Sequence, residues 1–149
     1  MFEVLAYVYE NYWRGDACPE PQQLGRKLSA VGFEAEEISQ ALDWLSGLRV
    51  GTVHEALPPS TAMRVYTPAE CEHLGAECLG FMQLLEGAGV LPAAQRELVV
   101  DRAMAAPGAP VALPEFKMIV LMVYWSSGTE PDALVLDELS QDTSARLAH

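Results

Sequence analysis

The longest uninterrupted apolar run in the chain, Met118–Trp125, limits what the chain can fold into more than any other segment. Its eight residues are far fewer than the roughly 20 that a helix needs to cross a bilayer. A helix over 114–126 would be apolar on nearly every side, and such a helix is either buried or part of an interface. We interpret it first as the central core helix of a small helical domain. The alternative is an exposed surface for a partner helix or for self-association, lined by Met118, Met122 and Trp125, because methionine-rich surfaces adapt readily to partners.

Other segments also show apolar residues at helical spacing and recognisable helix ends. The clearest start is Thr67-Pro68-Ala69-Glu70, a capping box with Pro at the first helical position and Glu three residues after the Thr cap. The helix that follows is expected to bend at Gly75 or Gly80. The fold class is therefore all-α, with at most one short strand pair near 49–66. Six or seven helices are predicted, over about 2–13, 21–31, 34–48, 68–86, 92–105, 114–126 and 131–139.

A break in the helical pattern divides the chain. Residues 49–62 contain Gly51, Pro58 and Pro59, which predict a loop or linker. We therefore predict an N-terminal three-helix unit, winged-helix-like in topology, packed against a C-terminal helical bundle, with a single compact domain as the alternative. The predicted units are 1–48 and 63–139, followed by a tail at 140–149.

The charge of the chain narrows the choice of partners. Among 149 residues, nine Lys and Arg stand against 21 Asp and Glu, which gives a formal net charge of −12. An acidic surface repels phosphate backbones and anionic membranes at long range. The composition therefore favours protein partners with basic surfaces over nucleic acid, and no membrane association is expected.

The cysteines and the N-terminus indicate the compartment. Cys18, Cys71 and Cys78 are an odd number and too few for a secreted disulfide framework. The first residues, MFEVLAYVYENYW, carry an acidic Glu3 and no basic leader, so they do not form a signal peptide. We expect a soluble, cytoplasmic protein.

Segments spread over nearly the whole chain form a recognisable set. The most specific is the Tyr-Thr-Pro-x-Glu-Cys element at residues 66–71, within RVYTPAECEHLGAECLGFMQLLEGAGVL. The others are MFEVLAYVYENY, GFEAEEISQALDWLSGL, RELVVDRAMA and LPEFKMIVLMVYW. With these segments the chain resembles the Smg family of small bacterial proteins of unknown function. The resemblance implies a fold and a bacterial cytoplasmic setting but no activity. It also implies an association with DNA processing, because genes of such proteins often neighbour genes for DNA uptake and topoisomerase.

Cys71, His73 and Cys78 raise the question of a metal or redox site. On a continuous helix, residues seven apart lie roughly 10 Å apart along the axis, too far for two thiolates to reach one zinc ion or to form a disulfide. His73 lies two residues after Cys71 and points to the opposite side of such a helix. We therefore expect both cysteines to be small core residues. A metal or redox site at Cys71 and Cys78 is the alternative, and a break at Gly75 would favour it.

The sequence shows no catalytic pattern. No Ser lies in a nucleophile-elbow motif and no glycine-rich phosphate loop follows a strand. On a helix, His73 cannot face Cys71 to act as its base. We therefore expect no enzyme activity, no cofactor and no resident metal.

The helices predicted at 21–31 and 34–48 have the layout of a helix-turn-helix, and the later Arg-Val-Tyr segment could serve as a wing. The second helix would enter the groove of DNA, yet it begins with Glu34, Glu36 and Glu37 and has no Lys or Arg before residue 49. These carboxylates would face the phosphates and be repelled. A winged-helix-like, DNA-associated factor linked to DNA processing or topology is therefore the alternative function.

The preferred function is a non-catalytic protein-interaction or regulatory module of the bacterial cytoplasm. Its partner is expected to be a protein, and the sequence leaves the oligomeric state open. The candidate interaction residues are Met118, Met122 and Trp125 of the apolar helix, together with Arg64 and Tyr66 of the segment before the capping box.

Overall fold

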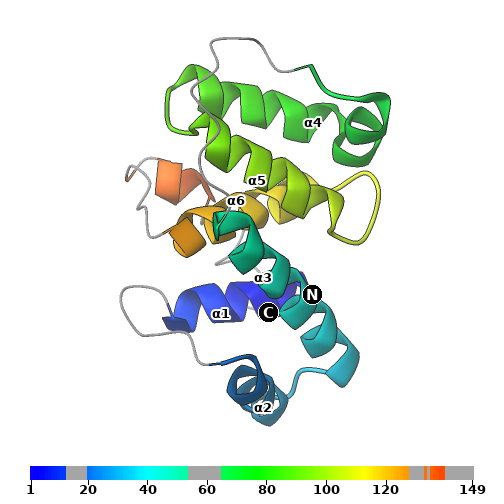
Figure 1. Cartoon of the computed structure of the whole chain (residues 1–149), viewed down its shortest axis with the longest axis vertical. Coiled ribbons are helices and arrows are strands. Elements are labelled where there is room, and N and C mark those ends of the chain that lie inside the picture. Colours follow the sequence, from blue (N-terminus) through cyan, green and yellow to red (C-terminus); the bar gives the residue numbers. More distant parts are fainter. Residues whose placement is uncertain (13–19, 54–64, 128–132, 134, 140–149) are drawn as a thin grey trace.

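The computed structural model describes residues 1–12, 20–53, 65–127, 133 and 135–139, with the side chains of 49–53 left aside (Figure 1). Within these ranges the chain is helical and contains no strand, which confirms the predicted all-α fold. Residues 135–139 are also helical and form the described part of the predicted last helix. The other helices are α1 (Phe2–Tyr12), α2 (Pro21–Val31), α3 (Ala35–Val53), α4 (Pro68–Gly87), α5 (Ala93–Met104) and α6 (Leu113–Ser127).

The end of α3 differs from the prediction. The helix continues to Val53, five residues beyond the predicted end at residue 48, so the predicted linker is helical over 49–53. Gly51 lies inside this stretch, and a glycine in a helix interior costs only about 1 kcal/mol. The first strong helix breaker is Pro58, which lies outside the described residues with the rest of the linker. The predicted strand pair is absent from 49–53 and from Val65 and Tyr66, the parts of 49–66 that the structure describes.

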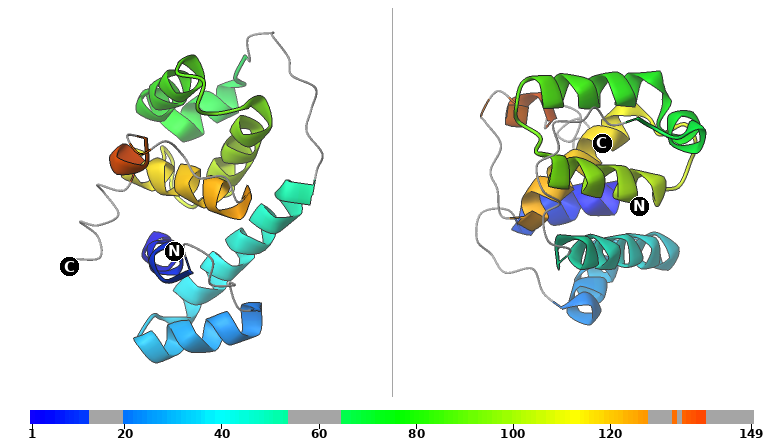
Figure 2. Two further views of the ribbon diagram at one scale, coloured as in Figure 1. Left: turned by 90° about the vertical axis from the view of Figure 1, so that its left-hand side faces the viewer. Right: turned by 45° about the horizontal axis from the view of Figure 1, so that its top comes forward.

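α6 is the central helix of the molecule. It contacts α1, α3, α4 and α5, and it lies between α1 and the α4–α5 pair (Figures 1 and 2). Every residue from Phe116 to Tyr124 is buried. A helix that is apolar on all sides is stable in water only when other helices cover it, which explains this position.

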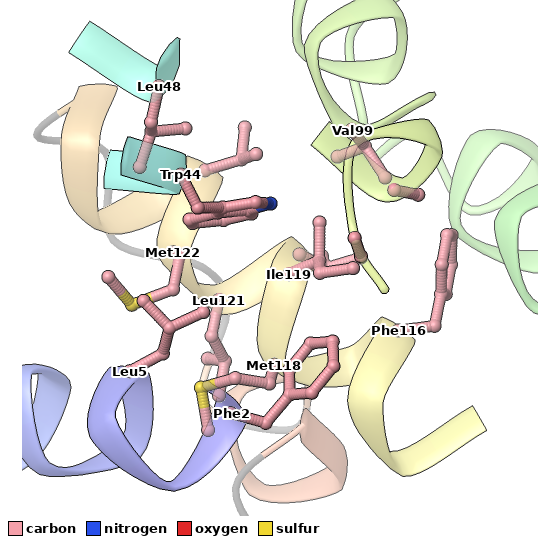
Figure 3. Packing of buried hydrophobic residues seen from close by; sticks show 14 of the residues in the cluster. Phe2, Leu5, Trp44, Leu48, Val99, Phe116, Met118, Ile119, Leu121 and Met122 are labelled. Atoms are coloured by element: carbon pink, nitrogen blue, oxygen red, sulfur yellow. The ribbon is translucent and has the colours of Figure 1, made fainter. Parts of the chain in front are cut away.

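One hydrophobic core surrounds α6 and joins the two predicted units. Figure 3 shows Leu5 of α1, Trp44 of α3 and Val99 of α5 packed around Ile119 and Met122. Burying one such side chain fully contributes about 1.5–3 kcal/mol, so the central helix supplies much of the stability. The division of the chain into units at 1–48 and 63–139 stays a prediction.

The capping box and the bend of α4 are both present. The Thr67 hydroxyl oxygen accepts a hydrogen bond of 3.2 Å from the backbone N–H of Glu70, and Pro68 is the first helical residue. At Gly75 the backbone leaves the helical conformation, with φ 79° and ψ 165°. α4 is therefore two helical pieces joined at Gly75.

The segment between α5 and α6 supports this break. The backbone N–H of Val111 donates to the His73 carbonyl at 2.8 Å. The Cys78 thiol donates in turn to the Val111 carbonyl, with an Sγ–O distance of 3.2 Å. Val111 thus bonds to both pieces of α4 and holds them at a defined angle.

Candidate functional site

Of the residues predicted to form an interaction surface, Met118, Met122, Trp125 and Tyr66 are among those that the structure describes. Met118 and Met122 are fully buried in the core, so they do not line an exposed groove. Trp125 is half-buried, and its indole N–H donates to the Tyr12 carbonyl at 3.3 Å. Tyr66 is half-buried and its hydroxyl lies 2.9 Å from the sulfur of Met82. Arg64 lies outside the described residues.

The two cysteines of α4 occupy different environments. Cys78 is buried as expected, whereas Cys71 is exposed, so the prediction that both are core residues is wrong for Cys71. The physical reason is Gly75, because the break turns the first piece of α4 relative to the second. Burial, together with the nearby carboxylates of Glu77 and Glu115, raises the pKa of the Cys78 thiol from 9.0 to about 11.

Among the described residues, Cys71 and Cys78 are not part of a cluster of metal-binding side chains. No group of three His, Cys, Asp or Glu side chains within the described ranges is placed to hold a metal ion. The His73 ring instead lies 2.9 Å from the Ala103 carbonyl, near the C-terminal end of α5. His73 therefore helps to join α4 to α5. Cys18 is not among the described residues.

An apolar groove lies between the second piece of α4 and the helical residues 135–139. Its volume is about 210 Å³, and Leu84, at 66% exposure, stands open to solvent at its edge. Leu84 adjoins other apolar residues, so its exposed side chain extends an apolar surface, and the groove is a candidate contact site for another molecule. Its lining residues are Phe81, Leu84, Leu85, Ala88, Val90, Val135 and Glu138.

The walls of the groove are held from below by α6. The Phe81 ring packs edge-to-face on Phe116, with ring centroids 6.3 Å apart. The hydroxyl of Tyr124 donates to the Val90 carbonyl and fixes the end of the groove. The groove surface is therefore organised by the core, and a ligand would meet walls that are already formed.

A buried lysine joins the two walls. The ammonium group of Lys117 lies 5.6 Å from the centre of the Phe81 ring and 2.9 Å from a carboxylate oxygen of Glu138. The Lys117 side chain is only 10% exposed, whereas that of Glu138 is 55% exposed. Lys117 thus anchors residues 135–139 against α4 while Glu138 stays in contact with water.

A second cavity, of about 350 Å³, lies between α3 and α5 beside Trp44 and Arg102. Its polar groups already serve helix packing. The Arg102 guanidinium donates to the Trp44 carbonyl at 3.1 Å and to the Asp101 carboxylate at 2.9 and 3.0 Å. The Trp44 indole N–H donates back to the Arg102 carbonyl at 2.9 Å. The Arg102 guanidinium is already neutralised by Asp101 and bonded to the backbone, so it is not available to bind a ligand. The groove is therefore the better candidate for a binding site.

Sequence reasoning missed Leu84, although a signal was present. The apolar face of this helix piece is wide, because it contains Phe81, Leu84, Leu85 and Ala88. A face of this width can extend beyond the part that the core covers. The opposite wall could not be found this way, because Val135 and Glu138 come from a segment far along the chain.

Comparison with known proteins gives the family of the chain. Among the residues that the structure describes, no helix is both long enough and apolar enough to cross a membrane.

The fold and groove define a small all-α protein built around one central helix. The family described as "Protein of unknown function (DUF494)" matches residues 1–149. No solved structure matches the chain.

The relatives are bacterial proteins of similar length. Protein Smg homolog from Leptothrix cholodnii is 58% identical over 150 residues, covering 100% of both chains. The homolog from Bordetella petrii is 50% identical over 152 residues, and the one from Azoarcus sp. is 48% identical over 155 residues, again with 100% of both chains covered. The chain therefore belongs to the Smg family.

Proposed function

We propose that this protein is a non-catalytic interaction or regulatory module of the bacterial cytoplasm, and that it binds another protein through the groove beside α4. The exposure of Leu84 beside a preformed apolar groove is the observation that carries the proposal. Helices of partner proteins commonly insert apolar side chains into grooves of this kind. The acidic net charge of −12 favours a partner protein over an anionic polymer or membrane.

A DNA-associated role has less support. The N-terminal end of α3, which would approach DNA in a helix-turn-helix, carries Glu36 and Glu37 in its first turn, directly after Glu34. The opposite face of α3 is committed to the core through Ile38 and Trp44. The face left over for DNA would therefore bring carboxylates to phosphates, which repel each other.

Site-specific photocrosslinking in the native host tests the proposal. A photoreactive amino acid replaces Leu84 in one variant and Gln23, an exposed residue of α2, in a matched control. We expect a discrete, light-dependent protein adduct with the Leu84 variant only, identified by mass spectrometry. The substitution of Leu84 by Asp should abolish co-purification of that same protein while leaving the thermal unfolding temperature nearly unchanged, because the site is on the surface.

Two outcomes would remove the proposal. One is the absence of any discrete adduct at residue 84. The other is an identical adduct at residue 23, which would indicate collision without a specific site.

A further inference from the structure

We infer that the groove beside α4 selects an amphipathic helix whose apolar residues are flanked by Lys or Arg. This inference rests on the proposed function and adds the chemical class of the partner. It follows from the charges of the two walls, the burial of the nearby cations and the size of the groove.

Both walls of the groove carry charges of one sign. α4 contains four Glu and no Lys or Arg, and residues 135–139 contain Asp137 and Glu138 and no basic residue. Glu77 is exposed and lies four residues before Phe81, so it is one helical turn from the groove on the same face. Glu138 lines the groove itself. A partner entering the groove therefore passes carboxylates at its edge.

The cations near the groove are largely buried, and each pairs with a carboxylate. Lys117 is buried between Phe81 and Glu138. Arg96 of α5 is also largely buried, and its Nε lies 3.4 Å from a carboxylate oxygen of Glu86. An ionised carboxylate has about four acceptor positions, so Glu138 can receive a cation of the partner while it still binds Lys117. The exposed carboxylates of Glu77 and Glu138 thus attract positive charge.

The dimensions of the groove set the apolar part of the partner. A cavity of about 150 Å³ holds a benzene molecule, so the 210 Å³ groove accepts one or two apolar side chains. A helix presents such a pair on one face at a spacing of three or four residues. Burial of these side chains against Leu84 supplies affinity, and the flanking cations supply selectivity, because charge complementarity governs the choice of partner more than the affinity.

Three labelled peptides serve as probes in a fluorescence-anisotropy titration of the full chain. The first is a helix with two Leu residues four apart, flanked by Lys and Arg. The second replaces every Lys and Arg by Glu. The third has the composition of the first in an order that destroys the apolar face. The protein is used as wild type and as the variants Glu77→Gln, Glu138→Gln, Leu84→Ser and Glu36→Gln. Glu36→Gln is the matched control, since it removes the same charge from α3, away from the groove.

We expect the first peptide to bind at least about 10-fold more tightly than the second and the third. Glu77→Gln and Glu138→Gln should each weaken its binding about two- to five-fold, the range typical of exposed ion pairs, whereas Glu36→Gln should change it less than about two-fold. Leu84→Ser should weaken it about 10-fold or more. Because Glu138 also binds Lys117, the unfolding temperature of each variant is measured. If Glu138→Gln is unfolded, the test of the acidic wall is the binding measured with Glu77→Gln.

Other results would overturn the inference. Equal binding of the first and second peptides would show that flanking charge is not selected. An effect of Glu36→Gln as large as that of Glu77→Gln would show general attraction to an acidic protein. If no peptide binds but the photocrosslink at residue 84 forms, the proposed function stands and the inferred partner class is wrong. If the peptide titration succeeds and the crosslink fails, the groove binds basic helices but has no partner in the host.

Discussion

Two cysteines of α4 show how far the environment of a residue depends on one backbone break. Cys71 and Cys78 are seven positions apart, a spacing that puts side chains on one face of a continuous helix. The break at Gly75 separates them, so one is exposed and the other bonds to the Val111 carbonyl in the core. Their chemistry differs accordingly, because the thiolate is the reactive form of cysteine.

We predict that native alkylation distinguishes the two thiols. At about pH 8, a rise of the Cys78 pKa from 9.0 to about 11 leaves roughly 100-fold less thiolate, and burial adds to this protection. Cys71 should react quickly with iodoacetamide and Cys78 only after unfolding, as read from peptide masses. Since burial favours the neutral thiol, the Cys78 rate should keep rising up to pH 11. Equal native rates at about pH 8 would contradict the placement of Cys78.

The contact between Gly47 of α3 and Arg102 of α5 also depends on the identity of single residues. A methyl group on Gly47 would overlap Nη1 of Arg102, which donates to the neighbouring Trp44 carbonyl. Gly47 thus leaves the space that the guanidinium needs to reach the backbone of α3. An alanine here would also raise helix propensity, so its two effects oppose each other.

A double-mutant cycle separates these effects. Gly47→Ala in the wild type should destabilise the fold by about 1–2 kcal/mol, because it displaces a charged hydrogen-bond donor. In an Arg102→Ala background the same change should stabilise by up to about 1 kcal/mol, the helix-propensity gain alone. Urea unfolding measures both values. The same cost in both backgrounds would show that Arg102 does not occupy this space.

At the scale of elements, the central feature is the division of α4 into two pieces. Gly75 has a positive φ, and its Cβ position would lie 3.3 Å from Cβ of Pro110. Residues with a side chain rarely adopt this conformation, and forcing them into it costs about 1–3 kcal/mol. The backbone conformation therefore favours glycine at this position.

We predict opposite effects for two glycines of α4. Gly75→Ala should lower the free energy of unfolding by about 1–3 kcal/mol. Gly80→Ala is the matched control: Gly80 is helical and exposed, with nothing within 4 Å of its Cβ position, so it should gain up to about 1 kcal/mol. Thermal unfolding followed by circular dichroism measures both. A stabilising Gly75→Ala would mean that α4 is continuous in solution.

Local sequence signals predict most of the helices. They fail where contacts between distant segments determine a helix bend or a helix end. The bounds of α2 agree with the prediction, because Pro21 starts the helix and Gly32 ends it in the left-handed conformation. Thr67 caps α4 as predicted. Whether the bend of α4 falls at Gly75 or at Gly80 depends on Val111, which bonds to both pieces only in the folded chain. The end of α3 was missed because a single glycine is a weak breaker.

At the scale of the whole molecule, one core contains residues from α1 at the start of the chain to Leu139, the last described residue. α6 packs against α1 and α3 on one side and against α4 and α5 on the other. The first interpretation of the apolar run, as a central core helix, agrees with its burial. Its alternative use as a methionine surface does not, and no local pattern could decide this, because burial depends on which helices cover it.

We predict that a change in α6 destabilises the whole chain at once. Ile119→Ala should cost about 2–5 kcal/mol, through lost burial and a cavity. Native-state hydrogen exchange should then show equal loss of protection in α1 and α5. Leu84→Ala removes a similar side chain from the surface and should cost less than about 0.5 kcal/mol. Loss confined to α5 would mean that the two predicted units unfold separately.

The hydrogen bond from the Trp125 indole to the Tyr12 carbonyl spans 113 positions of the sequence and has a consequence for biosynthesis. A ribosome adds roughly 5–20 residues per second, so Tyr12 leaves the peptidyl-transferase centre roughly 6–23 s before its partner Trp125 is made. During that interval nascent α1 and α3 have no α6 to cover their apolar faces. Chaperones that recognise exposed apolar segments can therefore bind every growing chain until α6 has been made and has packed.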